Sequence, residues 1–255
     1  LVASVTGNGV VNIVETNAID LAEVTTASGS ITVESGGTLT ATLVDSSATD
    51  NDTNDIFLTT TSGDIMVILI DGGSANDVTL TATGAITEDG QPSTLVTADL
   101  LTATASGPIT LDTTITTADL ASTTAGAIDV DETDAITLQS VVTQDGTITV
   151  DAGGTLTAVN VDSSATDNDA NDISLTTTAG DIAVVTITAG SANDVTLTAA
   201  GAITEDGQPA TLVTADLLTA TADGGITLDT TIATANLEST MAGAIDIDET
   251  DATTL

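Results

Sequence analysis

The fold is decided by a phrase in the second half of the chain, Val195-Thr196-Leu197-Thr198-Ala199-Ala200-Gly201-Ala202-Ile203-Thr204. Apolar and threonine side chains alternate up to the glycine, and a second short alternating run follows it. Alternation with period two is typical of a strand with one buried face, and Val, Ile and Thr favour strands. The phrase therefore predicts short strands joined by a tight turn.

A motif within this phrase, Gly-x-Ile followed in most copies by x-(Val/Leu), recurs along the whole chain at intervals of 19 to 34 residues. Strands this short cannot bury an apolar face alone, so successive copies are expected to stack. Parallel crossovers are right-handed as a rule. We therefore predict an all-β chain that folds as a right-handed parallel β-helix, or β-solenoid, with coils of about 20 residues. The motif begins at Gly29, Gly63, Gly84, Gly107, Gly126, Gly146, Gly180, Gly201, Gly224 and Gly243.

A longer repeat organises these copies. The run that starts at Val44 returns at Val161, 117 residues later, and the match continues without gaps from Gly9 onward. The predicted repeat units are residues 9–125, 126–242 and a partial unit at 243–255, within one continuous solenoid over residues 1–255. Because both ends cut through the pattern, we expect the parent protein to continue on each side.

Tandem Ig-like β-sandwich domains are the structural alternative, since 117 residues is an ordinary length for one such domain. Sandwich cores use aromatic anchors, and their strands need not resemble one another. In this chain Phe57 is the only aromatic residue, and one motif recurs in every coil. A narrow core of Ile, Val, Leu and Ala explains both facts.

Two phrases carry a resemblance to a known group. They are Ile173-Ser174-Leu175-Thr176-Thr177-Thr178-Ala179-Gly180-Asp181-Ile182 and the phrase at residues 195–204. With them the chain resembles the filamentous-haemagglutinin-like repeats of very large bacterial surface and secreted adhesins. The resemblance implies a right-handed β-helix that forms the shaft of an extracellular adhesin or filament.

The composition excludes several functions. The 255 residues include 38 Asp and Glu but no Lys, Arg, His, Cys, Trp or Tyr. No side chain titrates near neutral pH, and none is a thiolate or an amine nucleophile, so we expect no enzymatic activity. Phosphate-rich partners need basic side chains, which argues against binding of nucleic acid or anionic membranes. No apolar run is long enough to insert into a membrane. Divalent cations are the expected partners.

An acidic insertion interrupts one coil in each repeat, at residues 45–55 and 162–172. Its alternating Asp and Asn side chains follow the oxygen-ligand pattern of calcium loops, although the sixth position lacks the glycine of an EF-hand and the twelfth lacks its glutamate. Ca²⁺ is the predicted ion, and a plain solvated loop is the alternative. The candidate ligands are Asp45, Asp50, Asp52, Asn54 and Asp55, repeated as Asp162, Asp167, Asp169, Asn171 and Asp172.

A second acidic cluster lies outside the insertion and repeats once. Alternate carboxylates on one strand project outward with or without a metal, so this cluster is the weaker candidate. Its residues are Asp129, Asp131, Glu132 and Asp134, repeated as Asp246, Asp248, Glu249 and Asp251.

These observations predict a structural, extracellular or cell-surface role. We expect the rigid shaft of a prokaryotic adhesin, surface filament or matrix fibre, stiffened by divalent cations and in contact with neighbouring copies of the same repeat or filament. A self-polymerising filament or S-layer-like subunit is the alternative, because an open solenoid end can pair with another chain. Rows of outward Thr suggest an ice-binding adhesin segment as a third function. The sequence identifies no receptor.

Overall fold

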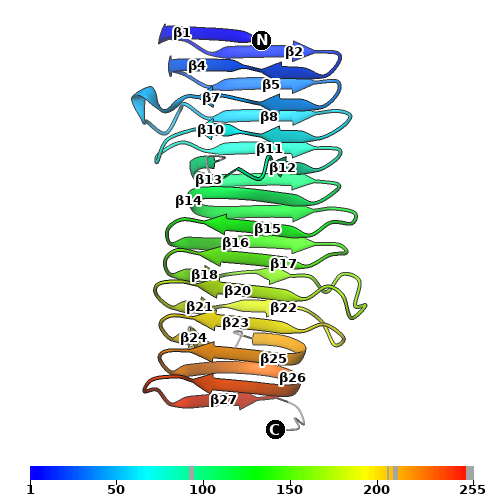
Figure 1. Ribbon diagram of the computed structural model, residues 1–255, viewed down its shortest axis with the longest axis vertical. Coiled ribbons are helices and arrows are strands. Elements are labelled where there is room, and N and C mark those ends of the chain that lie inside the picture. Colours follow the sequence, from blue (N-terminus) through cyan, green and yellow to red (C-terminus); the bar gives the residue numbers. More distant parts are fainter. Residues whose placement is uncertain (92–94, 206, 209–211, 251–255) are drawn as a thin grey trace. The chain divides into compact units, whose positions relative to one another are not determined.

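The protein is all-β in a computed structural model that describes residues 1–91, 95–205, 207–208 and 212–250 (Figure 1). It divides into two compact units, unit 1 (Leu1–Thr123) and unit 2 (Thr124–Leu255). Each is a parallel β-solenoid, and the coils lie about 21 residues apart. The predicted parallel solenoid is thereby confirmed and the tandem sandwiches are wrong. Its right-handed sense and its continuity over residues 1–255 stay predictions.

Unit 1 consists of short strands and one 3-10 turn, η1 (Ser47–Thr49). Its strands are β1 (Val2–Asn8), β2 (Val11–Glu15), β3 (Ile19–Leu21), β4 (Glu23–Ser28), β5 (Ile31–Ser35), β6 (Leu39–Ala41), β7 (Val44–Asp45), β8 (Ile56–Thr60), β9 (Ile65–Val67), β10 (Leu69–Asp71), β11 (Val78–Ala82), β12 (Ile86–Glu88), β13 (Leu95–Ala105) and β14 (Ile109–Ser122).

The described part of unit 2 consists of strands without a 3-10 turn. Its strands are β15 (Ile128–Glu132), β16 (Ile136–Thr143), β17 (Ile148–Ala152), β18 (Leu156–Ala158), β19 (Val161–Asp162), β20 (Ile173–Thr177), β21 (Ile182–Val184), β22 (Thr186–Thr188), β23 (Val195–Ala199), β24 (Ile203–Glu205), β25 (Leu212–Ala222), β26 (Ile226–Ser239) and β27 (Ile245–Glu249).

Each strand pairs in parallel with its counterpart in the next coil, so that like side chains lie on one another. In unit 1 Ile31 on β5 is in register with Ile56 on β8, and Ile56 with Val78 on β11. In unit 2 Ile182 on β21 is in register with Ile203 on β24. These apolar columns form the core, because one coil alone cannot bury its inward-facing side chains and the coils stacked on it cover them.

The core is built from small aliphatic side chains. Ile31, Ile56 and Leu80 are fully buried, whereas Phe57, the only aromatic residue, is 39% exposed. Burying an aliphatic side chain of this size stabilises a fold by about 1.5–3 kcal/mol. Among the described residues, every buried side-chain nitrogen or oxygen also has a hydrogen-bond partner.

The glycine of the recurring motif allows the coils to approach closely. Gly29 has a φ of 133°, and a Cβ atom there would lie 2.3 Å from the carbonyl oxygen of Gly9 in the preceding coil. Only glycine combines this backbone conformation with this contact. The motif thus marks the positions where one turn lies directly on the next.

Candidate cation site: the acidic loops

The two insertions form equivalent loops, one in each unit. Acidic loop 1 (residues 45–55) connects β7 to β8, and acidic loop 2 (residues 162–172) connects β19 to β20. Both project beyond the stacked strands (Figure 1). Each contacts a loop of the following coil, which we name receiving loop 1 (residues 72–77) and receiving loop 2 (residues 189–194).

Asp50 fastens acidic loop 1 to receiving loop 1. Its Oδ1 accepts a hydrogen bond from the Ala75 backbone N–H at 2.8 Å, and its Oδ2 accepts one from the Ser74 hydroxyl at 2.7 Å. In unit 2 the Asp167 carboxylate accepts the matching bonds from Ala192 N–H at 2.8 Å and from the Ser191 hydroxyl at 2.6 Å. We call these two carboxylates the anchors, because each joins two consecutive coils.

The anchors are stabilised in the ionised form. The Ser74 hydroxyl and then the Ala75 N–H hold the pKa of Asp50 below its usual value. Ser191 and Ala192 do the same for the pKa of Asp167. Hydrogen bonds to a carboxylate favour its charged state. Both oxygens of each anchor therefore serve the protein's own loops.

Asn54 is buried and links three coils. Its Oδ1 accepts a hydrogen bond from the Gly29 N–H of the preceding coil at 2.7 Å, and its Nδ2 donates to the Thr49 hydroxyl at 3.1 Å. Its backbone N–H donates at 3.1 Å to Oδ1 of Asn76 in the following coil, and Asn76 is also fully buried. The side chain predicted as a calcium ligand thus has internal partners.

Asn171 repeats most of this arrangement in unit 2. Its backbone N–H donates to Oδ1 of Asn193 at 3.0 Å, and its Nδ2 donates to the Thr166 carbonyl at 2.6 Å. Its side chain also lies against the carboxylate of Asp145, which occupies the place of Ser28 in unit 1. Asn168, then Thr166 and then Asn171, hold the pKa of Asp145 below its usual value by hydrogen bonding.

Asp45 lies at the start of acidic loop 1, in register with Asp71 on β10. The Ser47 hydroxyl lies between the two carboxylates, 2.8 Å from Asp45 Oδ1 and 3.2 Å from Asp71 Oδ2. Asp162 holds the Ser164 hydroxyl at 2.7 Å in the same way, but its register partner on β22 is Thr188. This stacked pair at the start of the acidic loop therefore has no counterpart at the start of acidic loop 2.

Asp52 and Asp55 contribute to an uncompensated negative potential. Asp55 Oδ1 accepts a hydrogen bond from the Asp77 N–H at 3.1 Å. Burial, and then the Asp55 charge, raise the pKa of Asp77, with smaller contributions from Asp99 and Asp52. Like charges disfavour ionisation when no cation offsets them.

The same arrangement of aspartates recurs in unit 2. Asp172 Oδ1 accepts from the Asp194 N–H at 2.9 Å. Burial and then Asp172 raise the pKa of Asp194, with smaller effects of Asp216 and Asp169. Each acidic loop thus ends beside a half-buried aspartate whose pKa is raised.

The predicted ligands do not converge on one point. Asp50 turns to receiving loop 1, Asn54 turns inward, and Asp52 is exposed at the tip. In the part of the chain that the structure describes, no three Asp or Glu side chains are grouped closely enough to hold a metal ion. An EF-hand-like chelate would require Asp50 and Asn54 to leave these partners. Calcium binding by the loops stays a prediction.

The second acidic cluster separates into inward and outward groups. Asp129 and Asp131 are exposed on β15, whereas Glu132 is only 4% exposed and its Oε1 accepts from the Asp134 N–H at 2.9 Å. Burial, followed by the charges of Asp131 and Asp151, raises the pKa of Asp129.

The repeat of this cluster lies on β27. Asp246 and Asp248 are exposed there, and Glu249 accepts from the Thr230 hydroxyl at 2.7 Å. Asp251 lies outside the described residues. In the first copy the four carboxyl groups therefore do not share one face, because Glu132 is buried whereas Asp129, Asp131 and Asp134 are exposed.

The pattern of the acidic insertions did not predict the receiving loops. They supply the partners of the anchors and of the buried asparagines, and they contain Asp77 and Asp194. A signal was present, because Ser74-Ala75-Asn76-Asp77 returns unchanged at residues 191–194. The acidic residues that suggest a cation site lie in one loop, whereas the hydrogen bonds join that loop to its receiving loop.

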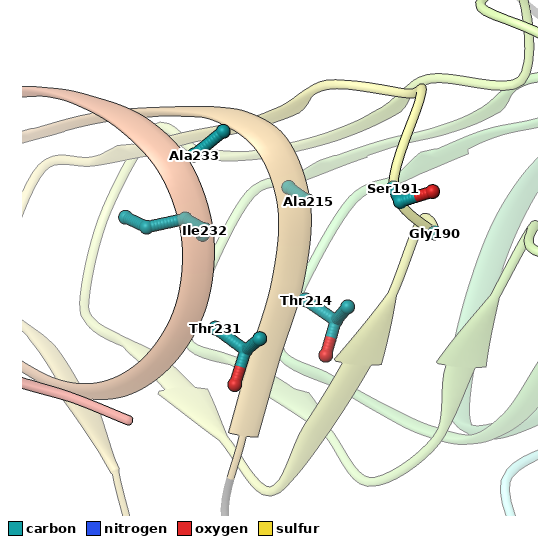
Figure 2. Close-up of a pocket in the computed structure, with 7 residues that line it drawn as sticks. All are labelled: Gly190, Ser191, Thr214, Ala215, Thr231, Ile232 and Ala233. Atoms are coloured by element: carbon teal, nitrogen blue, oxygen red, sulfur yellow. The ribbon is translucent and has the colours of Figure 1, made fainter. Parts of the chain in front are cut away.

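A shallow pocket of about 190 Å³ lies in unit 2 beside receiving loop 2 (Figure 2). No residue that lines it is titratable, and the Ser191 hydroxyl already donates to Asp167. The pocket therefore offers no titratable acid or base. Its lining residues are Gly190, Ser191, Thr214, Ala215, Thr231, Ile232 and Ala233.

Two further findings bear on the class of protein. Within the described ranges, no helix has the length and apolar character needed to cross a membrane. A scan against protein-family models, a search of curated proteins and a search of solved structures each found no match to the chain.

Proposed function

We propose that this chain is a structural, non-catalytic repeat segment: the rigid shaft of a prokaryotic extracellular adhesin, surface filament or matrix fibre, stiffened by divalent cations. The observation that carries this proposal is the stacking of like residues on like residues in coil after coil. Each coil of a unit binds its neighbours through backbone hydrogen bonds and aliphatic columns. Such an array resists bending without needing an active site.

The charge distribution supports the cation part of the proposal. The 38 carboxylates have no Lys or Arg to offset them. Carboxylates also stack in register between coils, as for Asp45 with Asp71 and Asp131 with Asp151. Like charges directly opposite one another on paired strands are destabilising. A divalent ion that lies between two such oxygens relieves this repulsion and joins the coils.

Calcium is the first candidate, because oxygen-only donors suit hard cations and Ca²⁺ accepts irregular coordination. The pairs Asp55–Asp77 in unit 1 and Asp172–Asp194 in unit 2 are the places where burial first, and then the neighbouring carboxylate, raises the pKa of Asp77 and of Asp194. We propose that a cation acts there by joining an acidic loop to its receiving loop.

Thermal unfolding followed by far-UV circular dichroism tests the proposal. The chain is melted in EDTA, in millimolar CaCl₂, in millimolar MgCl₂ and in NaCl of matched ionic strength. The unfolding midpoint in saturating calcium is expected to lie about 5 °C or more above the midpoint in magnesium, because a ligand that binds only the folded state stabilises that state. Equal midpoints in all three salts would leave only charge screening and would remove calcium from the proposal.

A self-polymerising filament or S-layer-like subunit is the second candidate. Strands β1 and β2 leave Val2 and Val14 67% and 71% exposed, and β27 leaves Ile245 44% exposed. Strands that expose apolar side chains can pair with another copy of the chain. Sedimentation velocity at increasing concentration distinguishes the candidates, because a subunit forms growing fibres and a shaft segment stays monomeric.

A further inference from the structure

The tip of acidic loop 1 presents an asparagine side chain to solvent. Asn51 and Thr53 are both exposed there, and the Thr53 hydroxyl donates a hydrogen bond to Oδ1 of Asn51. The Asn51 Nδ2 donates only to its own loop, to the Thr49 carbonyl at 3.2 Å. This bond can be given up without disturbing the core, because it lies at the surface.

Asn51, Asp52 and Thr53 form an Asn-x-Thr triplet with no proline in the middle, and no other Asn in the chain is followed two residues later by Ser or Thr. Such triplets are acceptors for N-linked sugars when they lie on an exposed loop. The hydrogen bond between Thr53 and Asn51 brings together the two side chains that define the acceptor.

We propose that Asn51 is an acceptor site for N-linked glycosylation. The donor is a sugar activated as a glycosyl diphosphate, bound to a lipid or a nucleotide, and a separate glycosyltransferase supplies the catalysis. The Asn51 Nδ2 forms a bond to the anomeric carbon of the sugar while the bond from that carbon to the diphosphate oxygen breaks. One Nδ2 proton leaves to a base on the transferase, and the diphosphate departs with the electron pair.

Acidic loop 2 provides a matched control within the same chain. It carries Asn168 and Asp169 at the equivalent positions, but Ala170 replaces the threonine. Asn168 is exposed, and its Nδ2 donates to Asp145 Oδ1 at 2.8 Å. The hydroxyl that a transferase must recognise is absent, so the proposal restricts the sugar to loop 1.

The test uses the full 255-residue chain, secreted from a eukaryotic host that transfers oligosaccharide to Asn-x-Thr triplets. Wild type is compared with Thr53→Ala, Asn51→Gln and Ala170→Thr. The intact mass counts the sugars. The chain is then digested with an Asp-specific protease and treated with an amidase that cleaves the sugar–amide bond. Conversion of the modified Asn to Asp locates each sugar. Circular dichroism confirms that the variants, all at an exposed tip, fold as the wild type does.

One N-linked sugar at Asn51 is expected in the wild type, none in Thr53→Ala or Asn51→Gln, and two in Ala170→Thr, at Asn51 and Asn168. A wild-type chain with the bare mass overturns the proposal, most clearly where Ala170→Thr gains a sugar at Asn168. A sugar that persists in Thr53→Ala also overturns it, because the modification then lies on other side chains. Neither result bears on cation binding, so this proposal and the shaft proposal fail independently.

Discussion

Acidic loops 1 and 2 differ in sequence at one position, Thr53 against Ala170, yet their tips differ in structure. Loop 1 contains the 3-10 turn η1, and its Thr53 hydroxyl binds Asn51. In loop 2 Asp169 takes a φ of 58°, and the Ala170 N–H donates at 3.0 Å to Asn193 in the receiving loop. The anchors Asp50 and Asp167 nevertheless make the same bonds. The anchors therefore hold both loops alike, whereas the tip of loop 1 is held by a local side-chain bond and the tip of loop 2 by bonds to neighbouring coils.

The largest difference between the two loops is expected at the buried asparagine. Asn54→Ala removes the acceptor of the Gly29 N–H and the donor to Thr49, and it should lower the free energy of unfolding by about 2–4 kcal/mol. Asn171→Ala should cost about 1 kcal/mol less, because its side chain lies against the carboxylate of the half-buried Asp145 rather than a backbone N–H. Urea unfolding measures both.

The exposed Asn51→Ala variant is the control for these substitutions, and it should stay within about 0.5 kcal/mol of the wild type. Equal losses for Asn54→Ala and Asn171→Ala would show that the bond to Gly29 contributes nothing to stability.

Substitution of the glycine beneath each anchor should affect the two units alike. Gly73 and Gly190 have φ values of 86° and 102°, and an added Cβ would lie 2.6 Å from Asp50 Oδ1 and 2.7 Å from Asp167 Oδ1, respectively. Gly73→Ala and Gly190→Ala should each cost about 1–3 kcal/mol, measured by the same urea titration.

Gly90 separates backbone strain from the clash with the anchor. It has a φ of 73°, but an added Cβ would meet nothing within 4 Å. Gly90→Ala should therefore cost less than Gly73→Ala, and Asp50→Ala should reduce the additional cost at Gly73 in a double-mutant cycle. A cost at Gly73 no larger than that at Gly90 would contradict the contact.

Replacement of the aspartates with raised pKa values should stabilise the protein. Asp77→Asn and Asp194→Asn remove a charge that burial and a neighbouring carboxylate oppose, so each should raise the melting midpoint at pH 7 by about 1–3 °C. The gain should vanish under acid. A carboxyl group whose pKa is raised by folding stabilises the folded state fully at pH values below its unfolded-state pKa. This stabilisation is lost as the pH rises through the folded-state pKa.

The anchors have the opposite dependence on pH. The pKa values of Asp50 and Asp167 are lowered, so their stability is present above the unfolded pKa and lost as pH falls through the folded one. The destabilisation in Asp50→Asn should therefore be largest at neutral pH and shrink toward the acid limb. Melts from pH 7 down to pH 2 compare the two classes, and parallel profiles for Asp50→Asn and Asp77→Asn would refute the distinction.

The smallest effect is expected at the one position where the loops differ. Thr53→Ala and Ala170→Thr should each change the free energy of unfolding by less than about 0.5 kcal/mol, because both side chains are exposed. Their effect should instead appear in amide hydrogen exchange at the tips. Thr53→Ala should slow exchange at residue 53 as its N–H leaves the Asn51 carbonyl at the surface for the buried Asn76 side chain, the counterpart of the Asn193 that Ala170 binds. Unchanged exchange would mean that the tips differ for reasons outside this residue pair.

Much of the fold could be predicted from the sequence because its determinants are local and repeated. The alternation around Gly201 and the recurrence of Gly-x-Ile specify which side chains lie inward, and they do so in every coil. The columns of Ile31, Ile56 and Val78 then follow from the parallel register.

The candidate site was harder to predict because its contacts join residues 22 to 25 positions apart. Asp50, Asp52 and Asn54 alternate in sequence as calcium ligands do. This spacing does not show whether the three side chains meet within one loop or bind neighbouring coils. Here Asp50 and Asn54 bind Ala75 and Gly29 on opposite sides. The competing donors are backbone N–H groups, which no sequence pattern displays.

The direction of the backbone hydrogen bonds determines how each unit responds to force. The bonds from Ile31 N–H to the Asp55 carbonyl, at 2.9 Å, and from Ile56 N–H to the Asp77 carbonyl, at 3.0 Å, run along the direction in which coils are stacked. A pull along that direction loads these bonds in tension, one coil after another, and a terminal coil can peel away while the next stays whole. A pull along the strands loads the bonds of a coil together in shear, where resistance is greater. The Asp50 anchor adds side-chain hydrogen bonds between two coils, so peeling should pause where an acidic loop contacts its receiving loop.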